Sequence, residues 1–378
     1  MGGLLSKLAL SALLLALSAC SSPAPAPAAP AKPAAGGSPA ATGAPAAAAP
    51  PAAAPAAAQP TAPPAPASIK VGVNPILSVS GLFVAMDRGY FAEQGLDVST
   101  ETITSPTAMV PALATNQVDV GTGAMSASLW NAIARGAEVR LAALQSAIIP
   151  GIPNSAYVVR KADLDSGAIG DFASLRGKRV SNNGTGNFTQ IVLWKAIELG
   201  GLTPDDVQVV DIAQPEALVG LLNGSLDVAA LSEPVRGAAL AQPGTAVWKE
   251  YYDIYPNQQA TAWVYSPQFA RERADIGKRT MVALLKGIRD FYDGMNHDVD
   301  RDAIIDIVVR HLEVRDRAPY ANVRVPVDPN GEFDVRLLQD DIDWYVANGF
   351  SPQRVDAAST IDRSFVDYAL QQLGRYQR

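Results

Sequence analysis

The sequence has almost none of the residues that build disulfides, zinc sites and histidine-based catalysis. It contains one cysteine, Cys20, and two histidines, His297 and His311, in 378 residues. Because no cysteine follows Cys20, the rest of the chain uses neither disulfides nor thiolate ligands. The scarcity of histidine gives little support to a histidine-based catalytic dyad or a zinc site, so we expect no metal site and no cofactor.

Basic residues are outnumbered by acidic ones. The chain has 30 Lys and Arg against 37 Asp and Glu, and its net charge is −7. A nucleic-acid-binding face needs a surplus of basic side chains, so no nucleic acid partner is expected.

The N-terminus has the layout of a secretory signal. Lys7 precedes the apolar run Leu8–Leu17, which is too short to span a bilayer as a helix. The segment Leu17-Ser18-Ala19-Cys20 resembles the bacterial lipobox, in which the chain is cut before the cysteine and the sulfur is joined to diacylglycerol. We therefore predict a signal peptide at 1–19 and lipid attachment at Cys20, with the lipid as the only contact with the cell membrane, on its extracytoplasmic face.

Residues 20–67 form a second compositional zone. After Cys20 this zone is nearly all alanine and proline, and Lys32 carries its only charge. Such a composition cannot bury a core. Proline-rich chains are semi-rigid, so the zone is predicted to be a tether between the lipid and a folded domain.

The folded remainder contains two copies of one pattern. A short apolar run near 69–73 leads into a loop, a helical pattern and another strand, and the same series begins again near 178–181. The copies share a closing motif, "LATNQVDVG" at 113–121 and "LLNGSLDVA" at 221–229. Repeated strand-helix units predict two α/β lobes, each a mostly parallel sheet flanked by helices.

The chain is expected to cross between the lobes near Gln145–Tyr157 and near Tyr251–Trp263. Lobe I is predicted to comprise 68–150 plus 258–378, and lobe II 151–257. Ligands of open α/β sheets bind beyond the carboxyl ends of the strands. We therefore expect a ligand cleft between the lobes, lined by the segments "NPILSVSG", "GTGAMSAS", "NNGTGNFT" and "SEPVR".

The stretch "LFVAMDRGYFAEQGLDV" (82–98) resembles the solute-binding proteins of bacterial ABC importers. The branch in question includes binders of nitrate, sulfonates, thiamine pyrimidine precursors and riboflavin. The motifs "LRGKRV", "GGLTPDDVQVV" and "NGSLDVAALSEP" are similar too, and the resemblance extends over about Ile69–Leu240. It implies a type II periplasmic-binding-protein fold, a monomer, and delivery of a small solute to a membrane permease driven by a cytoplasmic ATPase.

The cleft segments favour an uncharged solute. Residues 74–81, 121–128 and 182–190 carry no charge, and the fourth segment has Glu233 and Arg236, which are spaced to pair with each other. A flat heterocycle, riboflavin first and a thiamine pyrimidine precursor next, suits such loops. Because free N–H groups at helix N-termini favour anions, a sulfonate or nitrate stays the alternative.

Candidate ligand contacts are aromatic faces and polar groups of these segments, together with Trp263. They are Asn74, Ser78, Ser80, Gly123, Ser126, Trp130, Asn183, Thr185, Asn187, Phe188, Thr189, Glu233 and Trp263. Each has a plainer explanation: the tryptophans and Phe188 as core, Glu233 as the partner of Arg236, and the serines and asparagines as helix caps.

Two other functions are compatible with the same fold. Thiamine pyrimidine synthases resemble this family but use a cysteine-rich motif, iron and histidines. This chain has no cysteine after Cys20 and only two histidines, so the resemblance implies no enzymatic activity. A lipid-anchored solute sensor stays open. The loop "NGTGNFTQ" (183–190) is not a dinucleotide site, because Thr189 stands where the fingerprint needs its third glycine.

Overall fold

The structure, a computed structural model, describes residues 66–103, 106–312 and 316–377, all within the compact unit Thr61–Arg378. The predicted signal peptide, Cys20 and the tether up to residue 65 lie outside the described residues. In the described ranges, no helix combines the length and the apolar character that crossing a bilayer requires.

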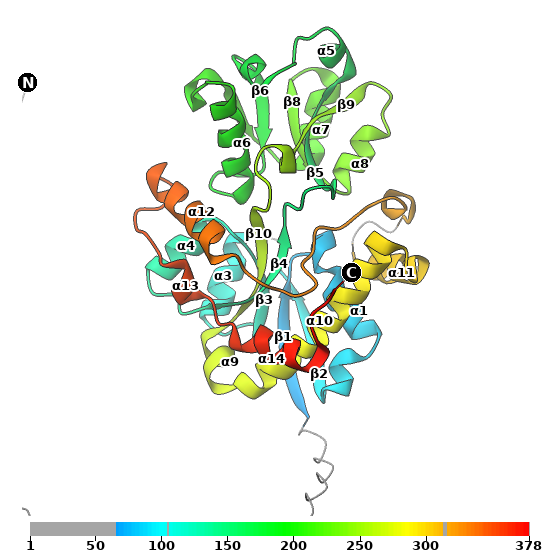
Figure 1. Cartoon of the computed structure of the whole chain (residues 1–378), viewed down its shortest axis with the longest axis vertical. Helices are drawn as coiled ribbons and strands as arrows, with labels where there is room; N and C mark the ends of the chain where they lie inside the picture. The colour runs from blue at the N-terminus through cyan, green and yellow to red at the C-terminus, as the bar shows by residue number, and fades with distance from the viewer. Residues whose placement is uncertain (1–65, 104–105, 313–315, 378) are drawn as a thin grey trace, which may run out of the picture. The chain divides into compact units, whose positions relative to one another are not determined.

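Two five-stranded sheets form the framework (Figure 1). The first sheet has the strand order β2-β1-β3-β10-β4. Its strands are β1 (Ala67–Val73), β2 (Leu96–Thr102), β3 (Val120–Ala124), β4 (Arg140–Ala147) and β10 (Gln259–Tyr265). Strand β1 runs parallel to β2 and β3, whereas β10 is antiparallel to β3 and β4.

The second sheet repeats this plan in the order β7-β6-β8-β5-β9. Its strands are β5 (Ser155–Arg160), β6 (Arg179–Asn182), β7 (Gln208–Asp211), β8 (Val228–Ser232) and β9 (Thr245–Glu250). Strand β6 is parallel to β7 and β8, and β5 is antiparallel to β8 and β9. In each sheet four strands therefore run in one direction, as the predicted mostly parallel sheets require, and one strand, β10 or β5, runs opposite to them. Each of these two opposed strands is the first strand after the chain crosses between sheets.

Helices flank both sheets. The α-helices are α1 (Ser80–Asp87), α2 (Tyr90–Glu93), α3 (Pro106–Ala114), α4 (Ala127–Ala134), α5 (Lys161–Asp165), α6 (Phe188–Leu199), α7 (Gln214–Asn223), α8 (Val235–Leu240), α9 (Pro267–Glu272), α10 (Ala274–His297), α11 (Arg301–His311), α12 (Val335–Ala347), α13 (Ala357–Thr360) and α14 (Ser364–Leu373). Short 3-10 turns are η1 (Leu77–Val79), η2 (Phe172–Leu175), η3 (Pro204–Asp206), η4 (Tyr251–Asp253) and η5 (Ala318–Tyr320).

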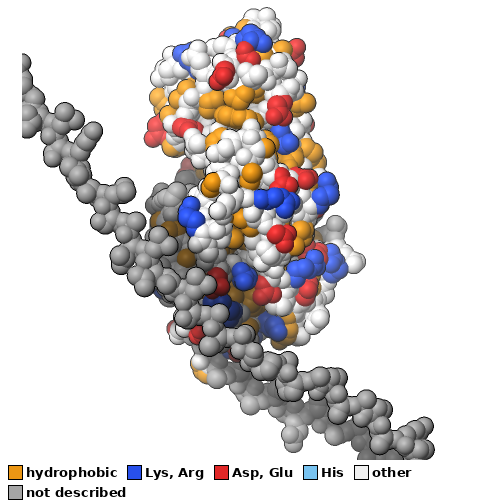
Figure 2. Space-filling model, turned by 90° about the vertical axis from the view of Figure 1, so that its left-hand side faces the viewer, with side chains coloured by type: hydrophobic (Ala, Val, Ile, Leu, Met, Phe, Trp, Pro, Cys, Tyr) orange, Lys and Arg blue, Asp and Glu red, His pale blue; other side chains and the backbone are white. Residues whose placement is uncertain are grey.

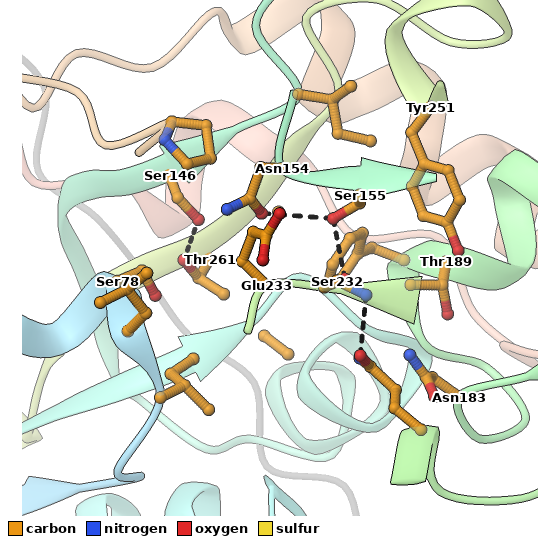
Figure 3. Close-up of a pocket in the computed structure, with 18 of the residues that line it drawn as sticks. Ser78, Ser146, Asn154, Ser155, Asn183, Thr189, Ser232, Glu233, Tyr251 and Thr261 are labelled. Carbon is orange, nitrogen blue, oxygen red and sulfur yellow. Dashed lines mark hydrogen bonds between the residues drawn. The ribbon is translucent and has the colours of Figure 1, made fainter. Parts of the chain in front are cut away.

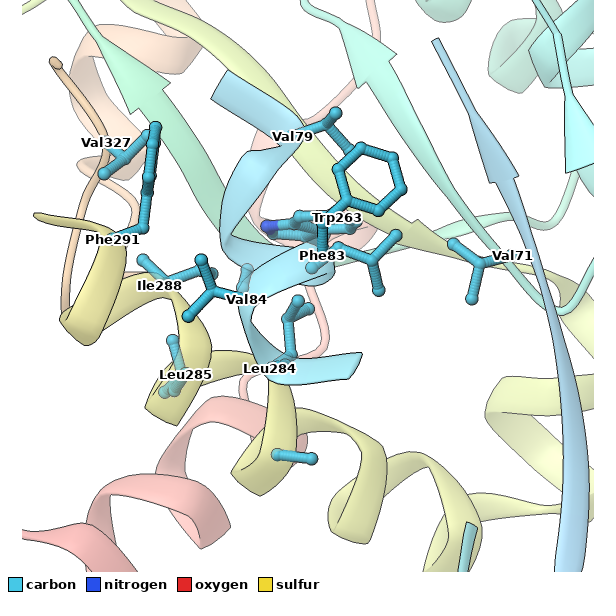
Figure 4. Packing of buried hydrophobic residues seen from close by; sticks show 14 of the residues in the cluster. Val71, Val79, Phe83, Val84, Trp263, Leu284, Leu285, Ile288, Phe291 and Val327 are labelled. Carbon is cyan, nitrogen blue, oxygen red and sulfur yellow. The ribbon is translucent and has the colours of Figure 1, made fainter. Parts of the chain in front are cut away.

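The core of the first sheet is closed by the pairing of α1 with α10 (Figure 4). Phe83 on α1 and Leu284 and Ile288 on α10 belong to one buried cluster. The two helices approach closely because glycines face each other: a Cβ on Gly287 would lie 2.3 Å from the carbonyl oxygen of Gly81. This packing fixes η1 and the start of α1 beside the end of β1.

The chain crosses between the sheets twice, through 148–154 and through 254–258. The crossings are hydrogen-bonded to each other: Ile148 N donates to Gln258 O (2.8 Å) and Asn257 N donates to Ile148 O (2.7 Å). Below, lobe I means the first sheet with its flanking helices, and lobe II the second sheet with α5–α8.

The visible surface carries no concentrated basic patch. On the uncovered part of the face in Figure 2, Lys and Arg side chains are interspersed with Asp and Glu. That face therefore lacks the basic stripe that nucleic acid binding requires.

Candidate functional site

A cavity of about 800 Å³ is lined by both lobes (Figure 3). Lobe I contributes the end of β1, the turn η1, and the ends of β4 and β10 that face lobe II. Lobe II contributes the start of β5, the N-terminus of α6, and the segments that follow β7 and β8. The cavity thus lies where the sequence predicted a cleft, and its volume is in the usual range for small-molecule sites.

The lining combines aliphatic surface with uncharged polar groups. Its apolar members include Ile76, Leu77, Ile148, Ile149, Ile152, Ile212, Val235, Val325 and Pro326. Its polar members include Asn74, Ser78, Ser146, Asn154, Ser155, Asn183, Asn187, Thr189, Gln214, Ser232 and Thr261. Among the described residues that line the cavity there is no Lys, Arg, His or Cys, and the carboxylates are those of Asp211 and Glu233.

The structure brings part of the predicted contact set together at this cavity. The predicted residues that line it are Asn74, Ser78, Asn183, Asn187, Phe188, Thr189 and Glu233. They come from the ends of β1, β6 and β8 and from the first turn of α6. Their role in ligand binding stays a prediction.

The predicted residues Ser80, Gly123, Ser126, Trp130, Thr185 and Trp263 do not line it. Trp130 and Trp263 are fully buried in separate hydrophobic clusters, so neither offers a stacking face. Ser80 is the buried first residue of α1, Gly123 packs against Val264, and Ser126 bonds to Ser128. Thr185 is exposed and donates to Asp211. The plainer explanation, core packing, therefore holds for the two tryptophans, whereas the side chains of Ser80 and Ser126 make no helix-cap hydrogen bond.

The glycine-rich loop before α6 is a helix entrance that also forms a wall of the cavity. Gly184 and Gly186 have φ values of 98° and 76°, which only glycine adopts readily. Asn187 is the N-cap: its Oδ1 accepts from Phe188 N (2.7 Å), and its Nδ2 donates to Asn183 O (3.2 Å). The loop therefore serves both as a cap and as part of the lining.

Both carboxylates of the lining are already engaged by the protein. Glu233 accepts from Arg236 Nη1 (3.1 Å) and from Gly237 N (3.0 Å), and Arg236 also pairs with Glu250. Burial raises the pKa of Glu233 above its usual range, and the bond from Arg236 opposes that shift. Asp211 accepts from Asn182 Nδ2 (2.9 Å) and from Thr185.

The sequence analysis missed the residues contributed by the antiparallel strands and the crossings. These are Ser146, Ile148, Ile149, Ile152, Asn154, Ser155, Tyr251, Tyr252 and Thr261. The rule that ligands bind beyond the carboxyl ends of strands was applied only to the parallel strands. The missed residues instead flank the points where the chain passes between sheets. The predicted crossings, 145–157 and 251–263, contain all of them and were the signal available.

The first turn of α6 is tied to lobe I. Ala127 N of α4 donates to Gly186 O (2.9 Å), and Gln258 Nε2 donates to Phe188 O (3.1 Å). Nearby, Tyr255 Oη donates to Asp341 Oδ1 of α12 (2.7 Å). Burial raises the pKa of Asp341 to about 7. The Phe188 wall is thus fixed from the lobe I side by hydrogen bonds that cross the lobe boundary.

Sequence comparison identifies the family. The family described as NMT1/THI5 like matches residues 77–294, so this chain belongs to it. A relative named 4-amino-5-hydroxymethyl-2-methylpyrimidine phosphate synthase THI11, from Saccharomyces cerevisiae, is 32% identical over 129 residues, 34% of this chain. The match spans 35% of that relative's length. A Brucella abortus protein named as a binding protein is 23% identical over 61% of this chain and 67% of its own length.

Comparison with solved structures identifies the fold. The periplasmic aliphatic sulphonate binding protein SsuA of Escherichia coli superposes with a TM-score of 0.64, at 20% identity over 79% of this chain and 93% of that one. This similarity confirms the predicted two-lobed periplasmic-binding-protein fold. At this identity, it is evidence for the fold alone.

Proposed function

We propose that this chain is the solute-binding component of an ABC import system, and that it acts as a monomer. Lobe I (68–150 and 258–378) and lobe II (151–257) would capture one small solute between them for a permease with its cytoplasmic ATPase. Cys20 would carry the lipid, and 20–67 would tether the domain to the extracytoplasmic face of the cell membrane. The observation that carries this proposal is the cavity of about 800 Å³ lined from both lobes.

The lining supports an uncharged solute with polar edges, such as riboflavin or a thiamine pyrimidine precursor. A desolvated anion needs charge-assisted donors, yet no cation lines the described cavity. Phe188, Tyr251 and Tyr252 offer aromatic surface there. Stacking on such rings adds about 0.5 to 1.5 kcal/mol beyond simple burial.

A sulfonate or nitrate is the second candidate. The SsuA structure, which is similar in fold, is named as a binding protein for aliphatic sulphonates, and this makes an oxyanion a candidate solute here. The N-terminus of α6 at the cavity would supply backbone donors without a cation. The comparisons thus support the oxyanion, whereas the lining supports the uncharged heterocycle.

The synthase names of the yeast relatives suggest a third candidate, an enzyme. The only two histidines of the chain do not line the cavity: His311 bonds to Asp87 and stacks on Phe83, and His297 lies beside Tyr292. In the described ranges, His, Cys, Asp and Glu form no cluster arranged to hold a metal. These placements support binding rather than catalysis as the function of the site.

Thermal-shift measurements with four solutes test the choice. Riboflavin, 4-amino-5-hydroxymethyl-2-methylpyrimidine, taurine and nitrate would be added separately to the full chain. A ligand at a hundred times its dissociation constant adds about 2.7 kcal/mol to the free energy of unfolding, so a true ligand gives a clear shift. Stabilisation by riboflavin or the pyrimidine is expected, and stabilisation by taurine or nitrate alone would transfer the proposal to the oxyanion.

A further inference from the structure

The side-chain hydrogen-bond donors available to a solute at this cavity are uncharged. The carboxylates of Asp211 and Glu233 each accept two hydrogen bonds from protein donors. A carboxylate has about four acceptor sites, so each of the two keeps acceptor capacity, whereas the side chains of the lining that donate hydrogen bonds are all uncharged. Hydrogen bonds to a solute are therefore expected from the hydroxyl and amide groups in the middle of the lining, where the two lobes meet (Figure 3).

In lobe II, a chain of hydrogen bonds orients the amide of Asn154. Ser232 Oγ and Ser155 Oγ are 2.8 Å apart, and Ser155 Oγ donates to Asn154 Oδ1 (3.3 Å). Both bonds form together when Ser232 donates to Ser155. The oxygen of the Asn154 amide is then occupied, and its Nδ2 has no partner among the described residues. Figure 3 shows this nitrogen pointing away from Ser155, toward the side of Ser146 and Thr261.

In lobe I, a hydroxyl pair offers one further donor. Ser146 Oγ and Thr261 Oγ1 lie 2.6 Å apart, and these residues are only 6% and 8% exposed. Two hydroxyl groups carry two hydrogens, and their mutual bond uses one. Neither hydroxyl has another partner in the described structure, and both residues line the cavity. The second hydrogen is therefore available to a molecule in the cavity.

We propose that Asn154 Nδ2 and the Ser146–Thr261 hydroxyl pair form one subsite that binds hydrogen-bond acceptors of a solute. The donors of this subsite come from both lobes. This inference rests on the proposed binding function and narrows its solute class. The solute presents uncharged acceptors, such as carbonyl oxygens or unprotonated ring nitrogens, at two positions. A solute without them leaves buried donors unpaired, and a site built this way rejects such analogues strongly.

Two near-isosteric substitutions test the subsite. Asn154→Asp keeps the acceptor for Ser155 but replaces the two amide donors with an acceptor oxygen, and Thr261→Val keeps the shape but removes one hydroxyl. For the solute that binds in the thermal-shift panel, we expect affinity to fall about a hundredfold in Asn154→Asp and about tenfold in Thr261→Val. Thr280→Val is the matched control, because Thr280 is 1% exposed and does not line the cavity.

A probe that does not depend on the natural solute keeps the proposal testable. The full chain, labelled with ¹⁵N, would be titrated with N,N-dimethylacetamide, which only accepts hydrogen bonds, and with methylammonium, which only donates them. The side-chain amide resonances of Asn154, assigned by their loss in Asn154→Asp, should shift saturably with dimethylacetamide and not with methylammonium. Thr261→Val should weaken this binding at least about threefold, and Thr280→Val should leave it unchanged.

The outcomes separate this inference from the proposed function. If none of the four solutes binds but dimethylacetamide shifts Asn154 as described, the solute panel is wrong and the subsite stands. If a solute binds equally well to the wild type, Asn154→Asp and Thr261→Val, the binding function stands and the subsite is refuted. A shift with methylammonium, or no saturable shift with dimethylacetamide, also refutes it.

Discussion

Helix α6 and the β4–β5 crossing both line the cavity, but they are held in place in different ways. The α6 side is filled with aromatic rings that pack across the lobe boundary. Trp194 of α6 meets Trp344 of α12 edge to face, with ring centroids 6.4 Å apart, and meets Phe350 at 6.2 Å. Ile191 of α6 is fully buried in the same cluster as Leu338 of α12.

The β4–β5 crossing lies at the other wall with much less support. Its residues 149–154 are partly or fully exposed, and Ile149 and Ile152 line the cavity rather than a core. It is joined to the other crossing by backbone hydrogen bonds of Ile148 with Asn257 and Gln258. From this difference we infer that the α6 wall contributes to the stability of the protein, whereas the crossing is the wall that we propose contacts the solute. Substitutions should therefore separate folding from binding.

The largest expected effect is the pH dependence contributed by Asp341 on the α6 side. Burial raises its pKa from 3.8 to about 7, so the folded chain binds this proton more tightly than the unfolded chain does. Between these values the free energy of unfolding falls as pH rises, by roughly 4 kcal/mol in total. Tyr255, Gln258 and Lys195 favour the charged form, and Asp340 opposes it.

Asp341→Asn isolates this contribution, because the amide stays uncharged and keeps an oxygen for Tyr255. Urea unfolding of both proteins at pH 4 and pH 8 is the measurement. The variant should gain stability relative to the wild type as pH rises. Equal pH dependence in the two proteins would show that ionisation of Asp341 at pH 8 does not lower the free energy of unfolding.

The aromatic contact between the lobes gives the next effect. Trp344 stacks on Phe350 (5.5 Å, 11°) and meets Trp194, so Trp344→Ala removes the middle of the cluster. Because Trp344 is half-buried, we expect a loss near the lower end for such truncations, about 3 kcal/mol in the free energy of unfolding. Trp344→Phe, which keeps a ring, should recover most of it. A loss below about 1 kcal/mol would mean that the α6 side is not held by packing.

These contrasts also explain what could be predicted from the sequence. The repeated motifs at 113–121 and 221–229 identified two sheets, and the strand-end rule located Asn74, Asn183 and Glu233 at the cavity. Trp130 and Trp263 were misplaced because the sequence does not say which side of a strand or helix faces the cleft. Asn154, Ser146 and Thr261 lie in the predicted crossings, but they were missed because a local pattern does not show how two distant crossings pair and which of their side chains face the cavity.

The smallest expected effect on stability belongs to the β4–β5 crossing. Ile149 lines the cavity and is partly exposed, so Ile149→Ala should change the free energy of unfolding by less than about 1 kcal/mol. It removes apolar surface that a bound solute would cover, and affinity should fall about tenfold. Val219→Ala, at an exposed position of α7 away from the cavity, is the matched control and should leave both quantities unchanged. Calorimetric titration measures the affinity of the three proteins, and urea unfolding measures their stability. If Ile149→Ala unfolds more easily than the wild type yet binds normally, the crossing contributes to stability and not to binding.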